Sequence, residues 1–199
     1  MFTYKCKVMP RSAGVKTKVE RAATDLFAAN GFDGVSIADI AAAAGVSQGA
    51  LYRHYRSKEE LAWALFSTAY LRTGEELDRI RTGAAGFEAA LTAMVAHFCA
   101  LYDEDSALFR FMLITQHGFL PRVPSGARTP VDAIADLVSD AVAKKRLKPI
   151  DPALGAAVIM GVILQSATFH IYGRLGGSVG ARAPALARAA IAAVTALAQ

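Results

Sequence analysis

The sequence has few cysteines, no secretory leader and little that could bind a metal. Its two cysteines, Cys6 and Cys99, lie far apart and form no Cys-x-x-Cys or Cys/His spacing. A disulfide framework and a structural zinc site are therefore not expected, and a reducing cytoplasm is the simplest location. The first twelve residues lack the continuous apolar core of a signal peptide. These absences predict a cytoplasmic protein without a bound metal. Met9 is a plausible alternative start of translation.

Catalytic patterns are also absent. Four histidines are scattered along the chain, and none belongs to a nucleophile, metal or phosphate-loop motif. They are His54, His97, His117 and His170. A single histidine on a helical face is more often structural than catalytic. We therefore predict that the chain is not an enzyme and requires no cofactor.

Charge is sparse and unevenly distributed. Charged residues make up 20% of the chain and hydrophobic residues 54%, which excludes an intrinsically disordered protein. Residues 1–58 contain nine Lys or Arg and four Asp or Glu, so this segment has a surplus of +5, equal to the net charge of the whole chain. The N-terminal quarter can therefore bind nucleic acid, although charge alone does not require it.

The segment from Val35 to Leu61 has the pattern of two short helices joined by a tight turn. Ser36 can cap the first helix, and Asp39 three residues later completes a capping-box pattern. Gly45 is expected to end this helix, because glycine adopts the left-handed conformation without a steric cost. Ser47 can cap the second helix, whose inward side would be Leu51 together with Tyr52 or Tyr55. This arrangement predicts a helix-turn-helix.

Two helices joined in this way could be a DNA-binding motif or an ordinary corner between core helices. The outer side of the second helix favours the DNA-binding motif. It carries no carboxylate, which suits an approach to phosphates. Gln48 can form a hydrogen bond with a base edge, and the small residues Gly49 and Ala50 permit close approach to the groove. The same segment also contains the polar residues Ser47, Tyr52, His54, Tyr55 and Lys58.

The sequence IADIAAAAGVSQGALYRHYRSKEEL resembles the DNA-binding region of the TetR family of bacterial transcriptional regulators. The resemblance runs from about residue 15 to residue 65. It implies base contacts by Gln48, Gly49 and Ala50, and phosphate contacts by a second set of residues. That set is Ser36, Ser47, Tyr52, Tyr55 and Lys58. Gln48 stands where a lysine or arginine is frequent, so no operator sequence is transferred from a relative.

The remainder of the chain is predicted to be helical, because it contains no convincing alternating strand. A long helix from Ser57 to Ile80 is expected to leave the DNA-binding head and enter the body. Residues 152–173 contain no Lys, Arg, Asp or Glu, which would permit a membrane span by length. We instead predict a soluble, centrally packed helix, because Gln165, Ser166, Thr168 and His170 interrupt its second half.

The resemblance implies an all-α homodimer that binds a palindromic operator and a small-molecule effector. Its expected parts are a flexible arm (1–13), a three-helix helix-turn-helix head (14–60) and a body for ligand binding and dimerisation (61–199). Helices 152–173 and 184–197 would form a four-helix bundle with the partner copy. Close approach there is expected at Gly155, Ala156, Ala189 and Ala193.

The middle helices combine large apolar side chains with isolated polar ones, a mixture that suits a small-molecule site. The expected ligand-binding residues are Phe98, Phe109, Met112, Gln116, His117, Gln165, Phe169 and Tyr172. The sequence predicts a repressor released by a small apolar effector. A constitutive DNA-binding protein without a ligand, and an activator in place of a repressor, both stay open. The effector, the operator sequence and the regulated genes are not predicted.

Overall fold

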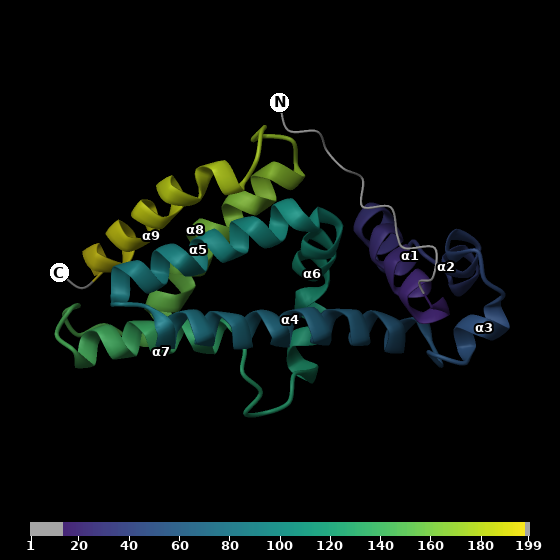
Figure 1. Cartoon of the computed structure of the whole chain (residues 1–199), viewed down its shortest axis with the longest axis horizontal. Coiled ribbons are helices and arrows are strands. Elements are labelled where there is room, and N and C mark those ends of the chain that lie inside the picture. Colours follow the sequence, from purple (N-terminus) through teal and green to yellow (C-terminus); the bar gives the residue numbers. More distant parts are fainter. Residues whose placement is uncertain (1–13, 198–199) are drawn as a thin grey trace. The chain divides into compact units, whose positions relative to one another are not determined.

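The computed structural model describes residues 14–197, which contain α-helices and two short 3₁₀ turns and no β-strand. Figure 1 shows the helices along the chain. The packing of the chain divides it into two compact units, with the boundary between Leu65 and Phe66. We call them the head and the body. The boundary lies a few residues beyond the predicted position 60, because the fully buried Leu61 and Ala62 belong to the first unit. The predicted arm at residues 1–13 lies outside the described residues.

The head consists of α1 (Val15–Asn30), α2 (Ile37–Ala44), α3 (Gln48–Tyr52) and the start of α4 (Lys58–Gly83). Its hydrophobic centre is formed mainly by side chains with an exposed fraction of 1% or less. They are Val19, Ala23, Phe27, Ile40, Leu51 and Leu61. These residues recur at helical spacing along each element, so every helix contributes one apolar face to a common core.

Short-range signals fix the two helices of the helix-turn-helix. The Ser36 hydroxyl accepts a hydrogen bond from the Asp39 amide at 3.2 Å, and the Asp39 carboxylate accepts one from the Ser36 amide at 2.9 Å. Gly45 ends α2 with a φ of 65°, a conformation that disfavours side chains. The Ser47 hydroxyl then caps α3 by accepting from the Ala50 amide. The predicted capping box, glycine stop and second cap are all confirmed.

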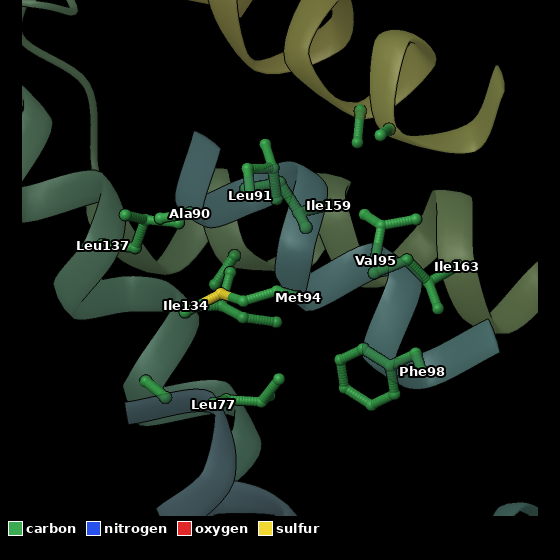
Figure 2. Close-up of a cluster of buried hydrophobic side chains, with 14 of the residues drawn as sticks. Leu77, Ala90, Leu91, Met94, Val95, Phe98, Ile134, Leu137, Ile159 and Ile163 are labelled. Atoms are coloured by element: carbon green, nitrogen blue, oxygen red, sulfur yellow. The ribbon is translucent and has the colours of Figure 1, made fainter. Parts of the chain in front are cut away.

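The body contains most of α4 and five further helices. These are α5 (Phe87–Glu104), α6 (Ser106–Phe119), α7 (Pro130–Ala143), α8 (Pro152–Ile171) and α9 (Ala183–Leu197). The 3₁₀ turns cover Leu120–Arg122 and Gly180–Arg182. Figure 2 shows how Leu91, Met94 and Phe98 of α5 form the middle of the core, with Ile134 of α7 and Ile159 of α8 packed around them.

The middle of α4 is held closely against the segment that precedes α7. A Cβ atom at Gly74 would lie 2.3 Å from the carbonyl oxygen of Arg128, so only glycine permits this approach. The Arg128 guanidinium also pairs with Asp78 of α4 and with Asp136 of α7. One turn further along α4, Arg81 pairs with Asp78 and reaches Asp140 of α7. These contacts connect α4 to α7 along one side of the body.

Helix α8 is long and apolar enough to cross a membrane, but it packs on α7 and α9 within the body. Its exposed side chains recur every three or four residues, and they form a stripe. The stripe, which we call the α8 stripe, contains Leu154, Ala157, Gly161, Gln165, Phe169 and Tyr172. Because only part of α8 is covered, the prediction of a centrally packed helix holds for one side of it within a single chain.

The structure corrects two of the positions predicted for close approach to a partner copy. Gly155 and Ala156 are buried inside their own body. A Cβ atom at Gly155 would lie 2.9 Å from a methyl group of Val138 on α7. Gly155 therefore serves the packing of α8 on α7, and Ala156 is part of the buried core of the body. Ala189 is exposed on α9, and Ala193 is half-buried.

Candidate nucleic-acid interface and effector cavity

Helix α3 presents a small polar surface because its apolar side chain is directed inward. Leu51 is fully buried in the head, whereas Gln48 and Gly49 on the preceding turn are exposed. Tyr52 is 49% exposed, and His54 follows it on the surface. Ala50 is half-buried. The exposed part of α3 therefore combines one amide, one phenol and small residues, a set that can approach a base edge closely.

The surroundings of α3 contain little negative charge. Residues 47–58 include no Asp or Glu, and Arg53 and Arg56 are exposed. On the preceding helix, α2, the carboxylate of Asp39 is engaged by Ser36. Hydrogen bonds from the Ser36 side chain and amide hold the pKa of Asp39 below its usual range. Ser36 and Ser47 are both exposed at helix starts, and each hydroxyl also accepts a capping hydrogen bond.

Two of the predicted phosphate contacts are directed into the head. Tyr55 is 5% exposed, and its hydroxyl donates to the Glu20 carboxylate of α1 at 2.5 Å. Burial and the neighbouring Glu20 carboxylate raise the pKa of Tyr55. Lys58 Nζ donates to the backbone carbonyls of Phe32 and Val35. These two side chains are therefore not brought together with the exposed residues of α3.

An apolar cavity of about 50 Å³ lies in the body. Its walls come from five helices, α4 to α8. The lining residues are Phe66, Tyr70, Thr73, Phe98, Leu101, Phe109, Met112, Leu113, Gln116, Pro130, Met160 and Leu164. None of these described wall residues is charged. A cavity of this volume exceeds the roughly 10–15 Å³ that one water requires, and its apolar walls favour an apolar occupant.

Few polar groups reach the cavity. The Thr73 hydroxyl donates to the Ala69 carbonyl at 2.9 Å, and the Gln116 amide donates to the Leu113 carbonyl at 3.1 Å. Burial raises the pKa of the Tyr70 hydroxyl, while its hydrogen bond with Thr129 acts in the opposite direction. Gln116 and Tyr70 are thus the polar side chains most able to orient a ligand there.

The structure brings half of the predicted ligand residues to this cavity. Phe98, Phe109, Met112 and Gln116 line it. His117 is exposed near the end of α6, and Gln165, Phe169 and Tyr172 belong to the α8 stripe. The prediction missed the wall formed by Phe66, Tyr70 and Thr73, because their spacing in α4 reads as an ordinary apolar helix face. It also missed Leu101, Leu113, Pro130, Met160 and Leu164.

A head with a capped helix-turn-helix and a helical body with an apolar cavity define the class of two-unit, helix-turn-helix DNA-binding proteins. Residues 21–65 match the family model described as bacterial regulatory proteins, tetR family. The match covers the helix-turn-helix and the start of α4, so the head is a DNA-binding unit of the tetR type. Because the members of this family are regulatory proteins, the prediction that the chain is not an enzyme is confirmed.

One curated relative and two solved structures give the extent of the similarity. A Mycobacterium tuberculosis protein described as the mycofactocin biosynthesis transcriptional regulator MftR is 34% identical over 105 residues. This match covers 53% of the chain and 52% of the relative, so the chain spans about half the length of the curated protein it matches.

The solved structures are similar over nearly the whole chain. The fatty acid degradation regulator FadR from Bacillus halodurans has a TM-score of 0.78 at 17% identity, covering 91% of this chain and 96% of that one. FadR from Bacillus subtilis, solved in complex with stearoyl-CoA, has a TM-score of 0.70 at 18% identity. This second match covers 88% of this chain and 97% of that one. At these identities the similarity establishes the fold, and the all-helical prediction is confirmed.

Proposed function

We propose that the chain is a cytoplasmic, homodimeric transcriptional repressor that leaves a palindromic DNA operator when a small apolar effector fills the body cavity. The observation that carries this proposal is the surface of α3. Gln48, Gly49 and Tyr52 are exposed on a TetR-type head, in a segment without carboxylates. An amide beside small residues suits a base edge in the major groove, and hydroxyl groups and cations suit phosphates.

The proposed DNA contacts are seven surface residues of the motif. Gln48, Gly49 and Ala50 would approach the bases. Ser36, Ser47, Tyr52 and His54 would contact the backbone. The exposed Arg53 and Arg56 add positive charge beside them. Tyr55 and Lys58 are left out of this surface because their side chains turn inward.

A second copy of the chain would cover the α8 stripe and the neighbouring face of α9. The stripe includes Leu154 (49% exposed), Phe169 (45%) and Tyr172 (71%), which are large apolar surfaces to leave in water. Helix α9 adds the exposed small residues Ala185, Ala189, Ala192 and Ala196, which permit a close approach of helices. In such a dimer the two recognition helices would meet half-sites about 34–36 Å apart or at a multiple of that spacing.

The proposed effector places an uncharged, apolar group in the cavity. Because none of the described wall residues is charged, a carboxylate or phosphate would find no counter-ion among them. A charged headgroup would therefore stay outside the walls, as an acyl thioester of the kind bound by the Bacillus subtilis FadR would allow. Because about 50 Å³ is small for such a chain, binding must separate the walls, and Met112 and Met160 have the flexibility to adapt.

Helix α4 supplies the proposed connection between effector and DNA. It is continuous from Lys58 to Gly83 (Figure 1). Its first residues therefore belong to the head, and Phe66, Tyr70 and Thr73 further along it line the cavity. A ligand that separates the cavity walls would move α4 together with its first turn. To release DNA, the ligand must bind the DNA-incompetent shape more tightly than the competent one.

Selection of binding sequences from random duplex DNA tests the DNA part of the proposal. We expect the full-length protein to enrich a site with two-fold symmetry, and failure to enrich any sequence would reject this part. The selected duplex is then titrated with acyl-CoA thioesters of increasing chain length. A ligand that raises the melting temperature and weakens DNA binding supports the effector. Stabilising ligands that leave DNA affinity unchanged would favour a constitutive DNA-binding protein.

A further inference from the structure

Lys58, the first residue of α4, is directed toward the turn between α1 and α2. Its ammonium donates to the carbonyl oxygens of Phe32 and Val35, each at 2.9 Å. The same Nζ atom lies 4.3 Å from the centroid of the Phe32 ring. The acceptors precede Lys58 by 26 and 23 positions, so this one side chain joins two distant parts of the head.

The turn to which Lys58 donates these hydrogen bonds connects α1 to α2 and determines where α2 begins. Gly31 ends α1 with a φ of 75°, and Ser36 caps α2 five residues later. The Phe32 and Val35 carbonyls lie between these two residues, outside the helical hydrogen-bond pattern. Val35 is 3% exposed, and the Phe32 ring packs on Phe27 with centroids 5.6 Å apart. Hydrogen bonds from a charged donor are stronger than neutral ones, so the ammonium holds this turn firmly.

The residues around Lys58 are themselves fixed. The Ser57 hydroxyl accepts from the Glu60 amide at 3.0 Å, and the Glu60 carboxylate accepts from the Arg56 amide at 2.7 Å. The first turn of α4 is therefore a rigid platform for the Lys58 side chain. From this platform the ammonium fixes the start of α2, and the glycine turn at Gly45 connects α2 directly to α3.

We infer that Lys58 is a positioning residue for DNA recognition, which fixes α2 and α3 relative to α4, and that it does not neutralise a DNA phosphate. Two of its three donors are used inside the head, and its charge faces two carbonyl oxygens and an aromatic ring. The inference rests on the proposed DNA-binding function. With Lys58 in this role, the first turn of α4 and the rest of the head form one rigid piece. Movement of α4 would then move α3, the recognition helix, as well.

Salt dependence distinguishes a positioning lysine from a phosphate contact. The slope of log K against log salt changes by about 0.9 for each phosphate that a protein neutralises on B-DNA. A dimer contains two copies of Lys58, so loss of two phosphate contacts would reduce the slope by about 1.8. Loss of a positioning contact would weaken binding at every salt concentration and leave the slope unchanged.

The test compares full-length wild-type protein with Lys58→Met, which keeps a flexible apolar stem and removes every donor. The probe is the duplex selected by the wild-type protein, with affinities measured across a series of salt concentrations. We expect Lys58→Met to weaken binding at least tenfold with a slope within about 0.5 of wild type. A slope reduced by about 1.8, or an unchanged affinity, would overturn the inference.

A measurement without DNA tests the tie itself, by which we mean the hydrogen bonds from Lys58 to the turn between α1 and α2. Amide hydrogen exchange across residues 33–40 should be several-fold faster in Lys58→Met than in wild type, because the turn loses both donors. The matched control is Arg56→Met, which removes an exposed cation two residues away and should leave exchange in this turn unchanged. Lys58→Arg, which keeps donors at this position, should retain most of the protection.

These two measurements separate the inference from the proposed function. If the wild-type protein selects no DNA sequence, the proposed function fails, and the exchange experiment still accepts or rejects the tie. If Lys58→Met exchanges like wild type across residues 33–40, the tie is rejected whatever the DNA result. If circular dichroism shows that Lys58→Met is unfolded, Lys58→Arg takes its place. In Lys58→Arg we expect both the salt slope of DNA binding and the protection of residues 33–40 from hydrogen exchange to be retained.

Discussion

Gln48 is the exposed side chain on α3 whose amide can read a base. The exposed phenol of Tyr52 is better suited to the sugar-phosphate backbone. The difference matters because an amide can both donate to and accept from a base edge, whereas phosphates are the same at every position. A base contact and a backbone contact therefore predict different patterns of loss across a set of DNA sequences.

Gln48→Ala should lose discrimination at one base pair in each half-site. The expected loss is about 1–3 kcal/mol against the preferred base, with little change on duplexes already mutated at that pair. Tyr52→Phe is the matched comparison and should weaken all duplexes to a similar degree. Binding is measured on the selected site and on its single-base variants. A uniform loss for Gln48→Ala would show that the residue contacts the backbone.

We expect the stability of the body to depend on pH through His97. It lies half-buried on α5, and burial lowers its pKa below the usual 6.5, an effect reinforced by Arg79 and Arg72 and opposed by Glu76 and Glu104. Because the folded pKa lies below the unfolded one, the unfolded chain binds more protons in this range. The stabilisation is complete above about pH 6.5 and is lost as pH falls through the folded pKa.

His97→Gln should flatten that dependence. The amide keeps a polar side chain that cannot take up a proton, so the melting temperature should fall less between about pH 7.5 and pH 5.5 than in wild type. The control is His117→Gln, which changes an exposed imidazole on α6. Carboxylates titrate mainly below this window, which isolates the histidines. Equal pH profiles for wild type and His97→Gln would exclude His97 as the source.

Sequence predicts a residue's neighbours well when they are close in the chain. Ser36, Asp39 and Gly45 act within one turn of either end of α2, so the order of residue types is enough to predict their roles. The sequence leaves open whether Tyr52 or Tyr55 turns inward, and the family resemblance implies a phosphate contact for Tyr55. Its partner Glu20 lies 35 positions earlier, and no local pattern reveals such a pair. The carbonyl acceptors of Lys58 are just as distant, and for the same reason they were not predicted.

At the scale of elements, α4 links the head to the body. Its cavity residues Phe66, Tyr70 and Thr73 lie on the turns that lead to Gly74. At Gly74 the helix lies against the backbone of Arg128 and Thr129. Any change in the cavity that shifts α4 must therefore slide or open this contact. The pairs of Arg128 with Asp78 and Asp136 hold it closed from both helices.

Gly74→Ala should open the contact between α4 and the start of α7. The added Cβ would lie 2.3 Å from a backbone oxygen, which cannot rotate away. Overpacking of this kind usually destabilises by about 1–3 kcal/mol, measured here by chemical denaturation. Gly118→Ala on α6 is the control, because none of the described atoms lies within 4 Å of its Cβ position. A wild-type stability for Gly74→Ala would mean that α4 is not held at this point.

Helices with clear periodicity are easier to orient from sequence than helix α8. An apolar helix without charges offers no pattern that tells its inner face from its outer one. The sequence therefore assigns Gly155 and Ala156 to a partner copy, although they are buried within their own body, and Phe169 to a ligand site, although it is exposed. Four of the residues predicted for a ligand site, on α5 and α6, do line the cavity, because large apolar side chains cluster there.

At the scale of the whole molecule, the proposed dimer should depend on the outer face of α9. Ala189→Glu would place an unpaired carboxylate where the partner's helices approach, and burying such a charge is strongly unfavourable. We expect monomer by light scattering and at least a hundredfold loss of affinity for a two-half-site duplex. Ala143→Glu, at an exposed alanine ending α7, should stay dimeric. A dimeric Ala189→Glu protein would exclude this part of the interface.

The proposed coupling between effector and DNA would involve both units, and Phe109 is the residue at which to test it. Phe109 lines the cavity, is 5% exposed and packs edge-on against Tyr102, with centroids 5.4 Å apart. Phe109→Leu keeps an apolar side chain of moderate size but removes the ring that a ligand chain would contact. The loss of roughly 1.4 kcal/mol of packing with the ligand would weaken its binding about tenfold.

Because Phe109 lies in the body, we expect Phe109→Leu to bind the selected duplex with nearly wild-type affinity when no ligand is present. About ten times more of the most effective acyl-CoA should then be needed to release the DNA. His117→Ala is the matched control, since His117 lies on the same helix but outside the cavity and should respond like wild type. DNA affinity is measured against ligand concentration for all three proteins. If Phe109→Leu and His117→Ala release DNA at the same ligand concentration as wild type, the ligand acts from a site other than this cavity.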